Sequence, residues 1–125
     1  MERRRRIALE AAKQSGRSIL PEISPTVSFA KALELAKKAD IALFCYEGDG
    51  TESLSKVLHE KKSELSRLSL PTVSIVIGSE GGFSQKEAEQ AREKGLIPVG
   101  LGKRILRTET AASFVLACLV YEWEL

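Results

Sequence analysis

The chain has 125 residues, of which 43% are hydrophobic and 29% charged, and its formal net charge is +2. This length accommodates one domain around one core, and the composition is that of a globular protein, not a disordered or collagen-like one. No apolar run approaches the roughly 18 residues of a membrane-spanning helix. The first residues also lack the apolar stretch of a secretory signal. These features predict a cytoplasmic domain without membrane association.

The cysteines and the histidine argue against several kinds of site. Cys45 and Cys118 lie within apolar stretches and lack the spacing of metal ligands, and His59 is the only histidine. Such isolated cysteines in apolar surroundings are typical of buried thiols in a reducing compartment. We therefore expect no metal site and no catalytic triad built on histidine.

Positive charge is concentrated at the start of the chain. Residues 1–17 hold six Lys or Arg and two acidic residues, a local net charge of +4, whereas the remainder carries −2. This asymmetry is compatible with an anionic partner near the N-terminus. It is equally compatible with a solvated first helical turn that has no partner, and the charge pattern alone leaves both interpretations open.

Hydrophobic periodicity predicts five helices along the chain. Apolar residues recur at helical spacing in most of them, whereas the third is mostly polar. Ser84, with Glu87 three residues later, forms a capping box at the start of the fourth helix, which Gly95 ends. The predicted helices span residues 2–14, 28–39, 52–68, 84–95 and 108–123.

Short apolar runs between these helices predict strands. The runs IALFCY (41–46) and VSIVI (73–77) are continuously apolar, as expected for strands covered on both faces, and residues 97–101 form a third strand. Residues 19–23 form a weak strand that Pro21 interrupts. The alternation of strands with helices predicts an α/β fold with a mostly parallel sheet and helices on both of its faces.

The last predicted helix is apolar around most of its circumference. One stripe and much of the opposite side are apolar, comprising Ala112, Phe114, Val115, Leu116, Cys118, Leu119, Val120, Tyr121 and Trp123. A helix of this kind must be buried on two sides. We favour a second copy of the chain as the cover for the second side, which predicts a homodimer. The alternative is a position between the sheet and another helix of the same chain.

Glycines cluster at the ends of the three apolar strands. Seven of the nine glycines follow or bracket these ends: Gly48, Gly50, Gly78, Gly81, Gly82, Gly100 and Gly102. Ligands of open α/β sheets bind outside the carboxyl ends of the strands, where glycines let a ligand approach the backbone. Any one loop would be an ordinary turn, but the clustering predicts a pocket walled largely by main chain.

The motifs exclude some classes of ligand for this pocket but do not identify one ligand. The loop GSEGGFS (78–84) lacks the Gly-Lys-Ser/Thr ending of a phosphate-binding loop, and no GxGxxG motif follows a strand. Main-chain amides and carbonyls suit the hydrogen-bonding edge of a purine or of another small polar molecule. The residues alone therefore indicate an adenosine-like ligand or another small molecule.

The segment LGKRILRTETA (101–111) is rich in functional residue types. Thr108 is a good helix N-cap and Glu109 suits the positive end of the helix dipole, so local capping suffices to explain both. Arg104 and Arg107 have no such local explanation. Arginines at the mouth of a pocket suit a phosphate group or a developing anion.

GSEGGFS and LGKRILRTETA, running into an apolar C-terminal helix, resemble motifs of the bacterial 16S ribosomal RNA uracil-N3 methyltransferases. These form the RsmE-type branch of the SPOUT (α/β-knotted) class. Upstream, RIALEAAKQSGR (6–17) and FCYEGDG (44–50) resemble the same family. The resemblance covers essentially the whole chain and implies a C-terminal trefoil knot, an S-adenosylmethionine cofactor, a ribosomal RNA substrate and a homodimer formed through the C-terminal helix.

The resemblance also assigns site residues. It implies that the cofactor is surrounded by Gly78, Glu80, Gly81, Gly82, Leu101, Gly102, Ile105 and Leu106. It further implies that four residues face the cofactor or the target uridine: Arg104, Arg107, Thr108 and Glu109. No metal is needed, because the methyl donor already carries a positive charge.

The implied reaction is an in-line transfer of methyl from sulfonium to the uracil N3, which must lose its proton. Arg107 or Arg104 would stabilise the resulting imide anion. Glu80, Glu109 or a bound water would accept the proton, and the target base would be splayed out of its RNA context.

The sequence departs from the family pattern in two ways. Ser79 stands where the family's loop usually has proline. In addition, an N-terminal PUA-like RNA-binding domain and the first strand–helix unit of the methyltransferase domain are expected in the family. We therefore interpret residues 1–125 as the SPOUT-type domain alone. The alternatives are a truncated, non-catalytic knotted domain that serves in dimerisation or RNA binding and, with less support, a flavodoxin-like nucleotide-binding domain.

Overall fold

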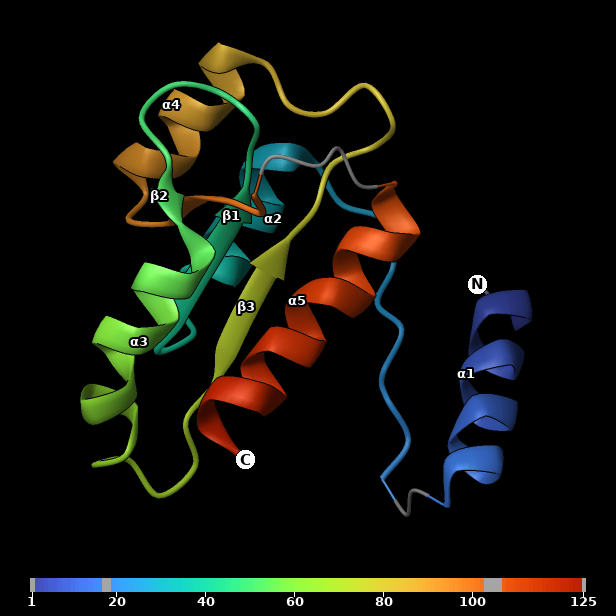
Figure 1. Cartoon of the computed structure of the whole chain (residues 1–125). Helices are drawn as coiled ribbons and strands as arrows, with labels where there is room; N and C mark the ends of the chain where they lie inside the picture. Colours follow the sequence, from blue (N-terminus) through green and yellow to red (C-terminus); the bar gives the residue numbers. More distant parts are fainter. Residues whose placement is uncertain (1, 17–18, 103–106, 125) are drawn as a thin grey trace.

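A parallel sheet forms the centre of the molecule (Figure 1). The computed structural model describes residues 2–16, 19–102 and 107–124. Within these residues the sheet has four strands in the order β2-β4-β1-β3, and each neighbouring pair is parallel. The strands are β1 (Ile41–Cys45), β2 (Glu52–Ser53), β3 (Val73–Val76) and β4 (Ile97–Gly100). The predicted parallel α/β sheet is thereby confirmed.

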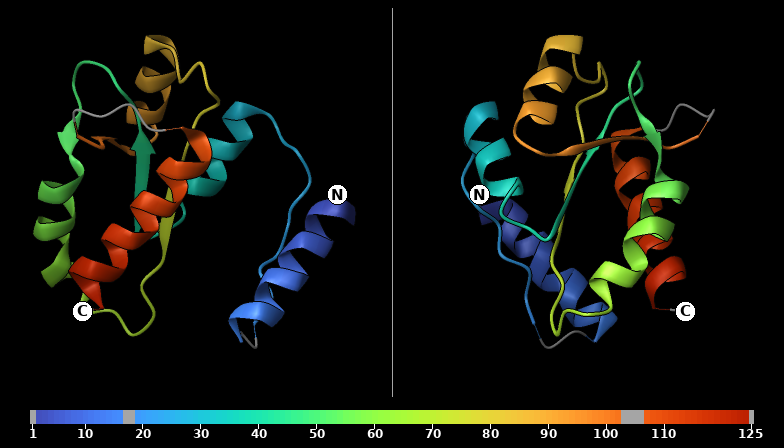
Figure 2. Two further views of the ribbon diagram at one scale, coloured as in Figure 1. Left: turned by 45° about the vertical axis from the view of Figure 1, so that its right-hand side comes forward. Right: turned by 90° about the vertical axis from the view of Figure 1, so that its left-hand side faces the viewer.

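Helices cover both faces of this sheet, as predicted. Figure 2 shows α3 and α5 on one face and α2 and α4 on the other. The helices are α1 (Glu2–Ser15), α2 (Phe29–Ala36), α3 (Leu54–Leu65), α4 (Gln85–Glu93) and α5 (Thr108–Trp123). Among the described helices, none is long and apolar enough to cross a membrane.

Strand β1 divides the core into two clusters because its side chains alternate between the faces. Ile41 and Leu43 belong to the cluster shared with α3 and α5. Ala42 and Phe44 belong to the cluster shared with α2 and α4. All four residues are at most 6% exposed, so β1 is covered on both faces as its continuous apolar sequence predicts.

The capping box of α4 is confirmed by its hydrogen bonds. The Ser84 hydroxyl accepts a bond from the Glu87 amide at 3.1 Å, and the Glu87 carboxylate accepts one from the Ser84 amide at 2.9 Å. These bonds satisfy amides that have no partner within the helix. They fix the point at which the chain passes from the preceding loop, residues 78–83, into the helix.

Two predicted elements are wrong. Residues 19–28 form no strand, since Pro21 and Pro25 provide no amide donor for a ladder. The helix predicted from residue 52 begins instead at Leu54, because Glu52 and Ser53 pair with Val99 and Gly100 at the edge of the sheet.

The N-terminal helix α1 stands apart from the sheet and is joined to it by the extended segment 19–28 (Figures 1 and 2). Most of its side chains are exposed, and Ala12 is its buried residue. The arginines at positions 3 to 6 are all exposed. Their positive charge is therefore available to an anionic partner.

Helix α5 is covered on one side only within the single chain. Ala111 and Val115 are buried, and the Trp123 indole donates a hydrogen bond to the Leu58 carbonyl of α3 at 3.1 Å. On the other side Leu116 is 56% exposed and Val120 42% exposed. The second apolar side thus has no cover from the described part of the same chain. The segment before α5 includes residues 103–106, which lie outside the described residues, so the predicted C-terminal knot stays a prediction.

Candidate active site

A cavity of about 230 Å³ lies at the carboxyl ends of the strands. We call it the strand-end cavity. Loops that follow β1, β3 and β4 form its walls together with the start of α5. Six of the predicted cofactor residues line it: Gly78, Glu80, Gly81, Gly82, Leu101 and Thr108. The parallel sheet places these three loops at one edge, which is where ligands of such sheets bind.

The loop over residues 78–83 is folded tightly on itself. The Gly82 amide donates to the Ser79 carbonyl at 2.8 Å, which closes a four-residue turn, and Gly82 has a φ of 70°. A Cβ atom on Gly78 would lie 3.1 Å from the Phe83 ring. The turn favours glycine at position 82, and a side chain at position 78 would make a tight contact with the Phe83 ring. Serine at position 79 is compatible with this turn.

Phe83 fixes the end of this loop to the core. Its ring centroid lies 4.3 Å from that of Phe44 on β1 and 5.8 Å from that of Phe29 on α2. Phe83 also lines the strand-end cavity. The loop is thus held to a buried strand by an aromatic contact that forms part of the cavity wall.

Thr108 has a different role from the predicted one. Arg107, not Thr108, occupies the N-cap position of α5, and it makes no side-chain capping bond. The Thr108 hydroxyl donates instead to the Gly78 carbonyl at 2.9 Å. The expectation of a local cap is wrong because a tertiary partner, 30 residues away in the sequence, binds this hydroxyl.

A second hollow adjoins the strand-end cavity. It measures about 410 Å³, and we call it the outer hollow. Tyr46, Glu47 and Leu101 line both spaces. Gly102, predicted as a cofactor residue, lines the outer hollow. Tyr46 and Glu47 were not predicted as site residues, although their position directly after β1 in FCYEGDG is a usable signal.

The predicted catalytic residues are only partly brought together. The exposed Glu80 lines the strand-end cavity. Arg107 and Glu109 are exposed on either side of Thr108 at the start of α5. Arg104, Ile105 and Leu106 lie outside the described residues. Glu80 therefore lies at the cavity. Arg107 and Glu109 are the sequence neighbours of Thr108, which lines the cavity.

Cys45 contributes an uncharged wall to the strand-end cavity. Burial raises the pKa of its thiol to about 11, because a thiolate would be poorly solvated there. Burial and the nearby Glu122 carboxylate also raise the pKa of Cys118. Buried thiols were expected, and both cysteines are free and only partly buried. Within the described ranges, no group of three or more His, Cys, Asp or Glu could hold a metal ion.

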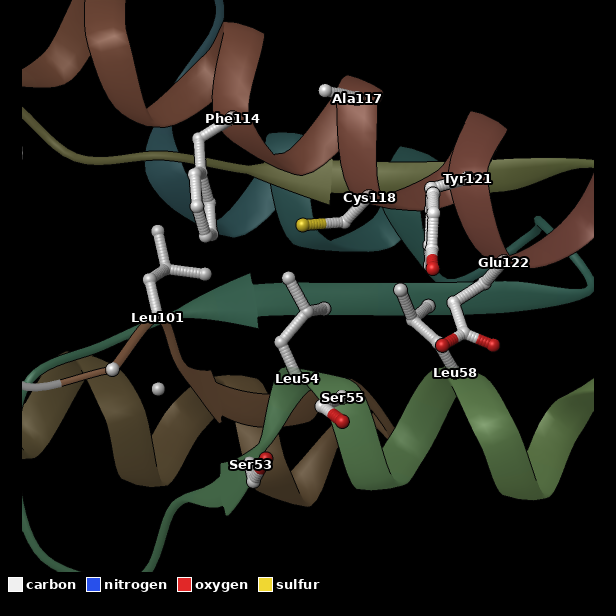
Figure 3. A pocket seen from close by; sticks show the side chains of 12 residues that line it. Ser53, Leu54, Ser55, Leu58, Leu101, Phe114, Ala117, Cys118, Tyr121 and Glu122 are labelled. Atoms are coloured by element: carbon white, nitrogen blue, oxygen red, sulfur yellow. The ribbon is translucent and has the colours of Figure 1, made fainter. Parts of the chain in front are cut away.

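An apolar groove of about 440 Å³ runs between α3 and α5. Figure 3 shows Phe114, Cys118 and Tyr121 of α5 facing Leu54 and Leu58 of α3. Gly100, Leu101 and Gly102 close one end of the groove. This groove and the strand-end cavity therefore share Leu101.

The sheet, the glycine-walled cavity and the apolar C-terminal helix define an α/β domain with a cavity at its strand ends. Residues 1–120 match the model of the family described as the RNA methyltransferase domain, and the chain belongs to this family. The resemblance to RsmE-type enzymes that the motifs indicate is thereby confirmed.

Named relatives support this assignment. The ribosomal RNA small subunit methyltransferase E of Bacillus subtilis is 36% identical over 124 residues, which are 99% of this chain and 48% of the relative. That of Mesomycoplasma hyopneumoniae is 35% identical over 117 residues, 93% of this chain and 46% of the relative. The chain therefore spans about half the length of these curated relatives.

Solved structures show the same fold. The ribosomal RNA small subunit methyltransferase E of Neisseria gonorrhoeae, bound to S-adenosyl methionine, is 31% identical with a TM-score of 0.79, and the match covers 98% of this chain and 47% of that one. A Legionella pneumophila protein in complex with the same cofactor is 29% identical with a TM-score of 0.74, over 94% of this chain and 44% of that one.

Proposed function

We propose that this chain is the cofactor-binding, methyl-transferring domain of a ribosomal RNA methyltransferase that modifies N3 of a uridine in 16S RNA. The observation that carries the proposal is the strand-end cavity, whose lining includes six residues of the family's cofactor motifs. Two related structures hold S-adenosylmethionine. The assignment to N3 of uracil rests on the resemblance to the RsmE-type branch.

The residues present fit S-adenosylmethionine. Gly81 and Gly82 have no neighbouring atom within 4 Å where a side chain would begin, so a ligand can approach the backbone there. The strand-end cavity alone is small, but with the outer hollow the space reaches the roughly 300–1,000 Å³ typical of small-molecule sites. A ligand bent at Tyr46 and Leu101 would extend into both spaces.

The two spaces suit the two ends of the cofactor. Main chain of residues 78–82 and apolar side chains such as Val99 and Ala111 wall the strand-end cavity, which suits an adenine ring. Glu47, Asp49 and Thr51 line the outer hollow, where carboxylates suit the ammonium group of the cofactor's methionine part and its sulfonium. When bound, the cofactor supplies an electrophilic methyl group on a sulfonium.

The chain's own residues would prepare the uracil. Methyl transfer would form an N–C bond at N3 and break the bond between the methyl group and sulfur, with S-adenosylhomocysteine as the leaving group. The N3 proton must leave so that the nitrogen lone pair can attack. Glu80, which lines the cavity, or Glu109 at the start of α5 would accept this proton directly or through water. The guanidinium of Arg107 or Arg104 would stabilise the imide anion through charge-assisted hydrogen bonds.

The partners follow from two surfaces. The exposed arginines at positions 3 to 6 on α1 would contact RNA phosphates. The exposed side of α5, with Leu116 and Val120, would pack against a second copy of the chain. We propose a homodimer on this basis, with the C-terminal knot of the SPOUT class.

The test is methylation of small-subunit RNA. The chain is incubated with S-adenosylmethionine and 16S RNA or 30S subunits, and the digested RNA is analysed by mass spectrometry. The proposal expects 3-methyluridine. Cofactor and RNA binding without any methylated uridine would instead favour a non-catalytic domain.

A further inference from the structure

Two of the walls of the strand-end cavity are joined by a side-chain hydrogen bond between segments far apart in the sequence. One wall is the loop after β3, which begins at Gly78, and the other is the start of α5 at Thr108. The Thr108 hydroxyl donates to the Gly78 carbonyl at 2.9 Å, and Thr108 is partly buried at the contact. Both residues line the cavity, so this bond lies in its wall.

Among the described residues, the hydroxyl of Thr108 makes no capping hydrogen bond to α5. Thr108 is the first residue of α5, and the residue at the N-cap position, Arg107, has an extended backbone with a ψ of 155°. A threonine that caps a helix would accept a bond from an amide two or three residues later. Here the hydroxyl acts as a donor to the neighbouring loop, which indicates a tertiary role.

The acceptor belongs to a loop that has little freedom of its own. The Gly82 amide closes the 79–82 turn through the Ser79 carbonyl, and the Phe83 ring holds the far end of the loop on Phe44. The Gly78 carbonyl is the point at which the near end of the loop is bound to α5. Thr108 and Phe83 thus hold the two ends of the same loop.

We propose that Thr108 is a positioning residue, which sets the width of the strand-end cavity through the Gly78 carbonyl and does not itself act on the substrate. This inference rests on the proposed function for the identity of the ligand. A carbonyl oxygen accepts two hydrogen bonds, so the bond to Thr108 leaves one acceptor site on Gly78 for the ligand. The hydroxyl therefore orients this carbonyl as well as fixing its distance from α5.

The experiment compares two substitutions at Thr108 with a matched control. Thr108→Val keeps the shape of the side chain and removes the hydroxyl, whereas Thr108→Ser keeps the hydroxyl. Ser113→Ala is the control, because Ser113 is on the same helix and its hydroxyl donates to the Glu109 carbonyl one turn earlier. It removes a hydroxyl from α5 without altering the cavity wall.

Two measurements on the intact chain are made for each variant. The first is hydrogen–deuterium exchange of the amides of residues 79–83 in the ligand-free protein. The second is the dissociation constant of S-adenosylhomocysteine by calorimetry. Thr108→Val is expected to raise both the exchange rate and the dissociation constant by roughly three- to tenfold, the range of one neutral hydrogen bond. Thr108→Ser and Ser113→Ala are expected to match the wild type in both.

The outcomes separate this inference from the proposed function. Unchanged exchange in Thr108→Val, or exchange in Thr108→Ser as fast as in Thr108→Val, would overturn the positioning role, whatever the ligand is. A wild-type chain that binds no S-adenosylhomocysteine, while exchange still depends on the hydroxyl, would refute the proposed function and leave the link between Thr108 and Gly78 supported.

Discussion

The ring centroid of Phe83 lies 4.3 Å from the ring centroid of Phe44, and the angle between the two ring planes is 31°. This contact joins the glycine loop of the cavity to the most deeply buried strand of the sheet. Phe44 is fully buried, and Phe83 lines the cavity. This aromatic contact therefore holds the loop that is proposed to bind the cofactor against the buried core.

Replacing Phe83 by alanine is expected to weaken both folding and cofactor binding. The ring is half-buried, so its loss should lower the free energy of unfolding by roughly 1–3 kcal/mol, less than for a fully buried ring. Phe29→Ala is the matched control, because Phe29 belongs to the same aromatic cluster and does not line the cavity. Urea unfolding and calorimetry should show a stability loss in both variants and a loss of affinity in Phe83→Ala alone. Equal affinities in the two variants would contradict this role.

Glu47 is expected to favour the positively charged cofactor over the neutral product. It lines both the strand-end cavity and the outer hollow, and its side chain is exposed. Glu47→Gln should weaken binding of S-adenosylmethionine by roughly two- to fivefold, since exposed charge pairs are weak. It should affect S-adenosylhomocysteine, which lacks the sulfonium charge, less. Glu52→Gln, an exposed acid on β2, is the control. Equal losses for both ligands in Glu47→Gln would exclude a charge effect.

Cys45 is expected to be nearly unreactive at neutral pH. Burial raises the pKa of its thiol from 9.0 to about 11, and only the thiolate is nucleophilic, so the reactive fraction at pH 8 falls about 100-fold. In the Cys118→Ser variant, the rate of alkylation by iodoacetamide should rise steadily between pH 8 and pH 11. Because Cys45 lines the strand-end cavity, S-adenosylhomocysteine should slow this reaction further. Rapid alkylation at pH 7, or no protection by a ligand that binds, would be inconsistent with this position.

The exposed side of α5 is expected to form the homodimer. Leu116 is 56% exposed on this helix, and a charge there would be buried without a partner in a dimer. Leu116→Glu should therefore convert a dimer to a monomer in sedimentation experiments. Leu70→Glu places the same charge on a leucine that is 86% exposed in the loop before β3, and it should leave the dimer intact. A wild-type chain that is monomeric at all concentrations would contradict the proposal.

Much of the fold could be predicted from the sequence because its local signals agree with the tertiary structure. Continuous apolar runs predict buried strands, and β1 and β3 form at these runs. The capping box at Ser84 predicts a helix start, and α4 begins there. Strand β2 was missed because its two residues are exposed, and only their pairing with β4 makes them a strand. The strand expected at residues 19–23 failed for the opposite reason, since its apolar residues found no partner strand.

The candidate site was predicted less completely. The glycine loops were found because close approach of backbone to a ligand leaves a compositional signature. The role of Thr108 was not found, because a hydroxyl at a helix start has an ordinary local explanation and its true partner is 30 residues distant. The position of Glu47 at the cavity could not be predicted, because it depends on the order of the strands in the sheet. Strand β1 lies between β3 and β4, so the residues that follow it lie between the other two loops.

The central claim is that the strand-end cavity binds S-adenosylmethionine, and a calorimetric titration of the wild type and Gly81→Val tests it most directly. Gly81 lines the cavity, has open space around its Cβ position and does not have a positive φ. Valine should therefore fill the space at the loop without straining the backbone. We predict binding to the wild type, loss of binding in Gly81→Val and similar melting temperatures. No binding to the folded wild type, or equal binding to both proteins, would contradict the claim.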